Sequence, residues 1–250
     1  MKRLIILALG LILASGGLMA QQDTLQATKK KLFKLHFTGG AAYSIPIGDF
    51  KDIDWDNDNS GYAGGGFNVS LGFNWIGKVG FGLGASYVFQ YNSLKDTAEN
   101  VVPDGHQFEL GTKAWNNHYL LAGPVYYQSF GKVTVEAGVL VGIVVAMSPN
   151  FYITLPAVDS LSQPTTSQGA GMGFAYKLTA GVGYQVSRRV SLSANISYLG
   201  GSPSRTKDYY YYHYEEDPIY GLIPVYQGAE VTIKKKISTI NPGIGITVKL

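Results

Sequence analysis

The feature that most constrains this chain is a period-two alternation of apolar and small polar residues, which recurs in eight segments. In residues 67–75, for example, every odd position is apolar and every even position is Asn, Ser or Gly. Because successive side chains of a β-strand point to opposite faces, each segment predicts a strand with one apolar face. The predicted strands are residues 33–43, 67–75, 79–91, 115–127, 133–147, 172–186, 190–198 and 240–250.

The connections between these strands alternate between short and long. Three are tight turns, at residues 76–78, 130–132 and 187–189. The other four are long, at residues 49–61, 92–112, 149–171 and 201–235. This alternation places the tight turns at one end and the long loops at the other, as in outer-membrane barrels, whose strands need about 9–11 residues to cross the bilayer. The sequence therefore predicts an all-β fold, an eight-stranded antiparallel up-and-down transmembrane β-barrel with periplasmic turns.

The size of the side chains indicates which face meets lipid. The lumen of an eight-stranded barrel is just wide enough for packed side chains, so Gly, Ser, Asn and Thr fit inside it and the bulky apolar face points outward. The soluble alternative is a lipocalin-like exported barrel whose apolar face surrounds a ligand. Charged residues make up 15% of the chain and aromatic residues 13%, which is unlike a disordered protein. A formal net charge of +3 gives no support to nucleic acid as a partner.

The N-terminus has the pattern of an export signal. Lys2 and Arg3 precede an apolar run at residues 4–13, and small residues follow before Ala20. We predict a signal peptide at 1–20, a short periplasmic tail at 21–30 and the barrel at 31–250, with a retained membrane anchor as the alternative for the first segment.

Two segments resemble a known family. The first is the Gly-Gly-Ala-Ala-Tyr-Ser-Ile-Pro-Ile-Gly-Asp-Phe phrase at residues 39–50, and the second is the closing strand with Ile244, Ile246 and Val248. Both are similar to the OmpA/OmpX-type small outer-membrane β-barrels of Gram-negative bacteria, the outer membrane protein β-barrel domain family. The family's usual terminal aromatic residue is replaced by Leu250. The resemblance implies an outer-membrane location, contact with outer-membrane lipid and lipopolysaccharide, and delivery by the barrel insertion machinery. It implies no reaction.

The same alternation predicts which charged side chains face the lumen. These are Lys34, His36, Lys78, His118, Glu136, Lys177 and Lys249. An unpaired charge in a narrow lumen is costly, and Glu136 is the one carboxylate in this set. We therefore predict a lumen ion pair between Glu136 and one or more of Lys34, Lys78 and Lys249, which blocks conduction. A narrow channel is the alternative.

The fourth long loop carries the most distinctive composition. Tyrosine is enriched in recognition surfaces, and a cluster of tyrosines here predicts a docking or adhesive surface. The cluster comprises Tyr209, Tyr210, Tyr211, Tyr212, Tyr214 and Tyr220. The alternative is a loop that packs on its neighbours and covers the barrel mouth. We expect a monomer that contacts an envelope protein or surface partner.

Catalytic and metal sites are weakly supported. His213 lies beside Glu215 and Glu216, but no serine is placed as a nucleophile, so a lipid A-modifying enzyme ranks below the docking and channel hypotheses. The acidic loop at residues 52–61 lacks the Gly and Glu that an EF-hand needs, although a weaker divalent-cation site there stays open. We predict a non-enzymatic protein without a cofactor.

Overall fold

The computed structural model describes residues 33–53, 60–95, 107–112, 114–154, 165–166, 170–217 and 221–250. Within these, it describes the backbone alone at residues 107–112, 150–154, 165–166, 207–231 and 233. Eight long strands form the barrel part of a nine-stranded sheet: β1 (Phe33–Pro46), β2 (Ala63–Gly77), β3 (Phe81–Leu94), β5 (Ala114–Phe130), β6 (Val133–Met147), β9 (Ala170–Gln185), β10 (Val190–Asp217) and β12 (Ile237–Lys249). Among the described residues, no helix is long and apolar enough to span a membrane.

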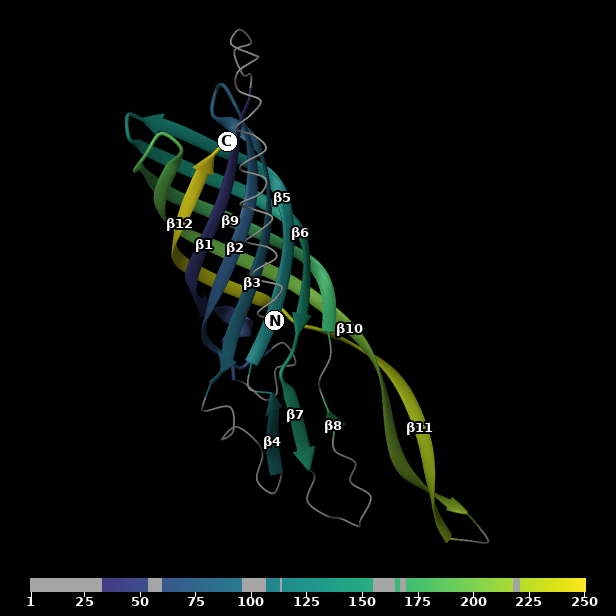
Figure 1. Cartoon of the computed structure of the whole chain (residues 1–250). Coiled ribbons are helices and arrows are strands. Elements are labelled where there is room, and N and C mark those ends of the chain that lie inside the picture. Colours follow the sequence, from purple (N-terminus) through teal and green to yellow (C-terminus); the bar gives the residue numbers. More distant parts are fainter. Residues whose placement is uncertain are drawn as a thin grey trace, which may run out of the picture. The chain divides into compact units, whose positions relative to one another are not determined.

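The eight strands close into a barrel (Figure 1). Neighbours in sequence pair in order from β1 to β9, β9 pairs with β10, and β10 pairs with β12. Closure is completed by β12 and β1, whose register includes Ala41 opposite Ile244. The predicted eight-stranded antiparallel barrel is therefore confirmed. A closed barrel satisfies the backbone hydrogen bonds of every strand and leaves no sheet edge in this part of the fold.

Tight turns join the strands at one end of the barrel. Gly80 has a φ of +88° and Gly131 a φ of +62°, a backbone conformation that glycine adopts without steric cost. The turn between β5 and β6 is a two-residue hairpin, because Phe130 pairs directly with Val133. At the other end the chain makes its long connections, the first of which contains the short helix η1 (Gly48–Phe50).

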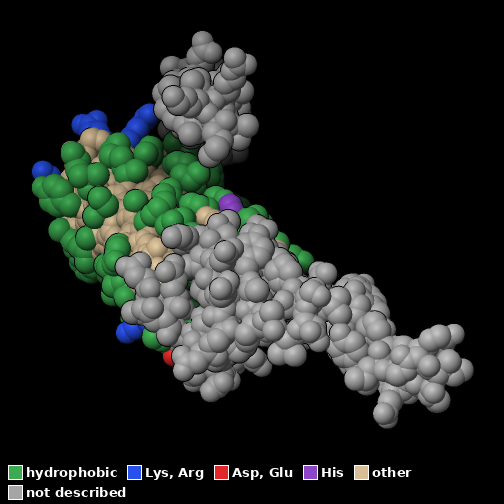
Figure 2. Space-filling model, turned by 90° about the horizontal axis from the view of Figure 1, so that it is seen from below, with side chains coloured by type: hydrophobic (Ala, Val, Ile, Leu, Met, Phe, Trp, Pro, Cys, Tyr) green, Lys and Arg blue, Asp and Glu red, His purple; other side chains and the backbone are tan. Residues whose placement is uncertain are grey.

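Outward-facing side chains form an apolar surface around the barrel. Tyr43, Trp75 and Tyr184 are each more than half exposed, and Figure 2 shows hydrophobic side chains covering the described part of this face. Inward positions carry the buried residues, many of them small or polar. The arrangement is the reverse of a lipocalin-like barrel, whose large apolar side chains face inward.

The register of β5 corrects one part of the sequence prediction. His118, expected in the lumen, lies on the outer face opposite Phe89, whereas Trp115 and Tyr127 point into the lumen. The alternation is ambiguous here because β5 has adjacent apolar residues such as Leu120 and Leu121. A one-residue change of register moves every side chain to the other face, so pairing with β3 and β6 decides which set is buried.

Three of the long connections contain further strands. β4 (Gln107–Thr112), β7 (Asn150–Thr154) and β8 (Thr165–Thr166) form a second, three-stranded sheet. The region predicted as the fourth loop is a two-stranded ribbon, in which the outer half of β10 pairs with β11 (Gly221–Lys234). β10 is continuous from the barrel into this ribbon.

Candidate functional site

The lumen contains a cavity of about 90 Å³ in the half of the barrel that is nearer to the tight turns. Its wall is built from small residues and from the side chains of Glu136 and Lys177. These two residues lie on the paired strands β6 and β9, where Glu136 is opposite Gly181 and Lys177 is opposite Leu140. Both side chains line the same cavity. The cavity has room for a few water molecules, which polar walls of this kind can hold.

The lysines predicted to pair with Glu136 lie elsewhere. Lys78 is exposed in the turn between β2 and β3, which corrects its predicted inward orientation. Lys34 is exposed at the start of β1, and the Nζ of Lys249 donates a hydrogen bond to the Oε1 of Gln185 at 3.5 Å. Within the described part of the chain, none of the three forms an ion pair with Glu136. Lys177 is the lysine that lines the same cavity as Glu136, although no ion pair joins these two described residues either.

His36 faces the turn-side end of the lumen, as predicted. It is 5% exposed, and its ring meets that of Tyr127 edge to face with 5.4 Å between centroids. Neither ring nitrogen has a hydrogen-bond partner in the described structure. The hydroxyl of Tyr127 accepts a hydrogen bond from the Nδ2 of Asn74 at 2.9 Å.

A belt of buried polar side chains crosses the loop-side half of the lumen. Gln90 lies at its centre: its Nε2 donates to the Oγ of Ser44 and to the Oδ1 of Asn92, both at 2.8 Å. The hydroxyl of Tyr119 donates to the Oε1 of Gln90, also at 2.8 Å. We call this set the polar belt; it comprises Ser44, Asn68, Gln90, Asn92, Tyr119, Thr239 and Asn241. Bonds between five strands make it a rigid plug.

On the loop side of the polar belt, two buried aromatic side chains pack against each other. Phe50 from η1 is 1% exposed and meets the ring of Trp115 at 5.4 Å, and the Nε1 of Trp115 donates to the backbone oxygen of Gly61 at 2.7 Å. A Cβ at Gly61 would lie 2.6 Å from the Phe50 oxygen, so only glycine permits this approach. We call Phe50 and Trp115 the mouth cap.

Two contacts tie the first long connection to the start of β12. The Nζ of Lys235 donates to the backbone oxygen of Ser60 at 3.0 Å. The Nζ of Lys236 lies 3.3 Å from the Oδ2 of Asp49. These contacts link the segment that carries Phe50 to the strand that returns from the ribbon, although an exposed ion pair contributes little free energy by itself.

The predicted tyrosine surface lies largely on the ribbon. Tyr209, Tyr210, Tyr211, Tyr212 and Tyr214 belong to β10, where Tyr209 is opposite Ala229 and Tyr214 is opposite Pro224. The backbone places His213 on the same strand, opposite Val225. Tyr220 and residues 54–59 of the acidic first loop lie outside the described residues. Among the residues that are described, no group of three His, Asp or Glu side chains is arranged to hold a metal ion.

Two features of the lumen were not predicted from the sequence: the mouth cap, and the choice of Lys177 as the lysine that shares the cavity with Glu136. The mouth cap joins residues 65 positions apart, and no spacing rule links a loop phenylalanine to a strand tryptophan. The proximity of Glu136 and Lys177 follows from the alternation that placed both side chains in the lumen. Which lysine faces the carboxylate depends on the register of β6 and β9.

No family model matches the chain, and no curated protein matches it. Similar solved structures include Neisserial surface protein A, with 14% identity, a TM-score of 0.40, and coverage of 87% of this chain and 97% of that one. Ail of Yersinia pestis, solved with the heparin analogue sucrose octasulfate, has 12% identity, a TM-score of 0.40, and coverage of 86% and 98%. A major outer membrane protein of Thermus thermophilus has 11% identity, a TM-score of 0.44, and coverage of 87% and 99%.

Proposed function

We propose that this protein is an integral outer-membrane β-barrel with a closed lumen, which acts as a non-enzymatic anchor for a protein-docking ribbon. Its membrane location is supported by the apolar outer surface, on which Phe81 and Leu83 are each 64% exposed. Exposed apolar area on this scale is unfavourable in water and favourable in lipid. The strand lengths of 13 residues or more match a tilted crossing of the bilayer.

The contents of the lumen support an anchoring rather than a transport role. The polar belt fills the loop-side half, and the mouth cap covers it. Leu121, Val144 and Leu199 pack among these groups and are almost completely buried. An eight-stranded barrel leaves little space beyond its own side chains, so a filled lumen stabilises the fold and leaves no continuous path for solutes.

The observation that carries the docking proposal is the extension of β10 beyond the barrel. The last pair with β9 is Ser204 opposite Met172, and from Arg205 to Asp217 this strand pairs with β11 alone. Among the described strands, the outer edge of β11 has no neighbour. An isolated two-stranded ribbon is marginally stable, and its edges are suited to pairing with a strand of another protein. A tyrosine-rich sequence adds contact area at low entropic cost.

A ribbon deletion tests this function. Thr206 pairs with Thr232, and their hydroxyls lie 3.2 Å apart, so replacing residues 207–231 by Asn-Gly closes β10 and β11 with a two-residue turn. We expect cross-linked complexes on the cell surface to disappear in this variant. The barrel pairs of β10 all precede the deletion, so heat-modifiable gel mobility in detergent is expected to persist.

A matched variant separates the side chains from the backbone edge. Replacement of Tyr209, Tyr210, Tyr211 and Tyr212 by serine leaves the length of the ribbon unchanged. Loss of the complexes in both variants assigns the contact to the tyrosines, and loss in the deletion alone assigns it to the strand edge. Complexes that survive the deletion contradict the docking function.

A further inference from the structure

The tight-turn end of the barrel carries a ring of exposed basic side chains. Lys78 lies in the turn between β2 and β3, Lys132 in the turn between β5 and β6, and Arg188 and Arg189 in the turn between β9 and β10. Lys34 is exposed at the start of β1. Each hairpin end around the closed barrel therefore presents at least one cation. We call these five residues the basic collar.

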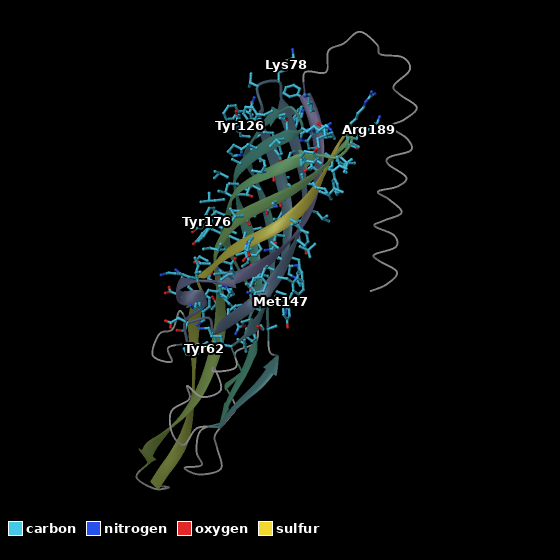
Figure 3. The ribbon with its side chains drawn as sticks, turned by 90° about the vertical axis from the view of Figure 1, so that its left-hand side faces the viewer. Tyr62, Lys78, Tyr126, Met147, Tyr176 and Arg189 are labelled. Atoms are coloured by element: carbon cyan, nitrogen blue, oxygen red, sulfur yellow. The ribbon has the colours of Figure 1, made fainter. Side chains whose placement is uncertain are left out.

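Among the described residues, the collar has no side-chain counter-charge on its own end of the barrel. Of the described Asp and Glu residues, Glu136 lies in the lumen, and Asp49 and Asp52 lie in the first long connection at the opposite end. The others belong to β4 or to the ribbon. Figure 3 shows Lys78 and Arg189 at one end of the barrel, directed away from it, with Tyr62 and Met147 toward the other. A single-sign rim of this kind attracts anions.

Each basic residue also adjoins the apolar surface of the barrel. Val79, next to Lys78, is 75% exposed, and Phe130, two residues before Lys132, is 63% exposed. Val186 and Val190 flank the two arginines in sequence. Figure 2 shows Lys and Arg side chains at the margin of the hydrophobic surface. When apolar neighbours lie in the acyl region, the flexible stems of Lys and Arg bring their charges to the level of the head groups.

We infer that the basic collar binds the phosphate groups of anionic phospholipids in the leaflet that the tight turns face. The inference rests on the proposed membrane insertion and adds the lipid class and the residues that select it. Near an anionic surface, each Lys or Arg favours association by roughly fivefold. The collar thus enriches anionic lipid around the turn-side end of the barrel and fixes the depth at which that end sits.

Trp75 provides a local reporter for this lipid. It is 54% exposed on the outer face of β2, three residues before Lys78. Trp115 is buried in the mouth cap, so a Trp55→Phe variant of the full chain leaves Trp75 as its lipid-facing tryptophan. Bilayers of phosphatidylcholine are prepared with an equal small fraction of brominated phosphatidylglycerol or brominated phosphatidylcholine, and quenching of tryptophan fluorescence is compared.

We expect brominated phosphatidylglycerol to quench Trp75 several-fold more effectively than brominated phosphatidylcholine at low salt. The difference is expected to vanish at high salt, because ions screen exposed charges. It is also expected to vanish when all five collar residues, Lys34, Lys78, Lys132, Arg188 and Arg189, are replaced by glutamine. The matched control replaces five loop-side lysines, Lys51, Lys95, Lys234, Lys235 and Lys236, by glutamine and retains the preference.

Equal quenching by the two lipids overturns the inference and leaves membrane insertion intact. A preference that survives in the collar variant, or that the loop-side variant removes, also overturns it. If neither brominated lipid quenches Trp75, the membrane proposal itself fails, and the collar has no lipid to bind.

Discussion

The charged side chains of Glu136 and Lys177 distinguish this lumen most clearly from an apolar packed core. A carboxylate and an ammonium share the wall of one cavity, where attraction between opposite charges offsets part of the cost of burial. His36 lies deeper toward the turns, where its buried ring packs against that of Tyr127. Ionisable groups in this lumen therefore lie at two levels, a carboxylate and an ammonium at the cavity and an imidazole near the turns.

A double-mutant cycle tests the pair. We expect Glu136→Gln and Lys177→Met each to lower the free energy of unfolding by about 1–3 kcal/mol, because each leaves the partner's charge without its counter-charge. The double variant is expected to lose less than the sum of the two. Urea unfolding in detergent micelles measures all four proteins. The control cycle joins Glu136→Gln to Lys249→Met and is expected to be additive. Additivity in the Lys177 cycle contradicts the pairing.

At the scale of elements, β5 shows how neighbouring strands override a local pattern. Its sequence places apolar residues on both faces, and the pairs with β3 and β6 select the set that is buried. His118 is left on the outer face, where its Nδ1 lies 2.7 Å from the hydroxyl of Tyr87. This bond satisfies a polar ring in apolar surroundings, close to the loop-side margin where Tyr43 and Tyr91 also lie.

Spin labels test the orientation of β5. The chain contains no cysteine, so Leu120→Cys and Leu121→Cys each carry a single label. Leu120 is 60% exposed and Leu121 is 2% exposed. We expect the label at 120 to be mobile and accessible to oxygen dissolved in the bilayer. The label at 121 is expected to be immobilised and to reduce stability, because it overfills the lumen. The opposite pattern contradicts the observed register.

At the scale of the whole molecule, the outer surface of the closed barrel and its lumen have different roles. In the proposed function, the outer surface and tight turns hold the protein in the bilayer, while the lumen is occupied by structural contacts. The long connections and the ribbon would then leave the membrane on one side, because an even number of strands returns the chain to its starting side. On this proposal any partner is met on the loop side, and the turn side meets lipid phosphate.

Planar bilayers test the closed lumen. We expect the inserted protein to be electrically silent, because the polar belt and the mouth cap block the path. Glu136→Ala is expected to stay silent, since this residue lies on the turn side of the belt. Insertion is checked by heat-modifiable mobility of the protein recovered from the same lipid. Stepwise conductance of the unmodified protein supports the narrow channel instead.

The alternation of residue types was sufficient to predict the eight strands, the class of barrel, the ends that hold the turns and the side chains of β6 and β9 that face inward. These properties depend on residues two positions apart and on the lengths of connections, both of which are local. The tertiary structure decided four other features: the lysine that shares the cavity with Glu136, the orientation of His118, the burial of Phe50 against Trp115, and the ribbon in place of a loop. Each depends on the register of strands or on contacts between distant segments, and a one-residue shift in pairing changes them while leaving every local pattern the same.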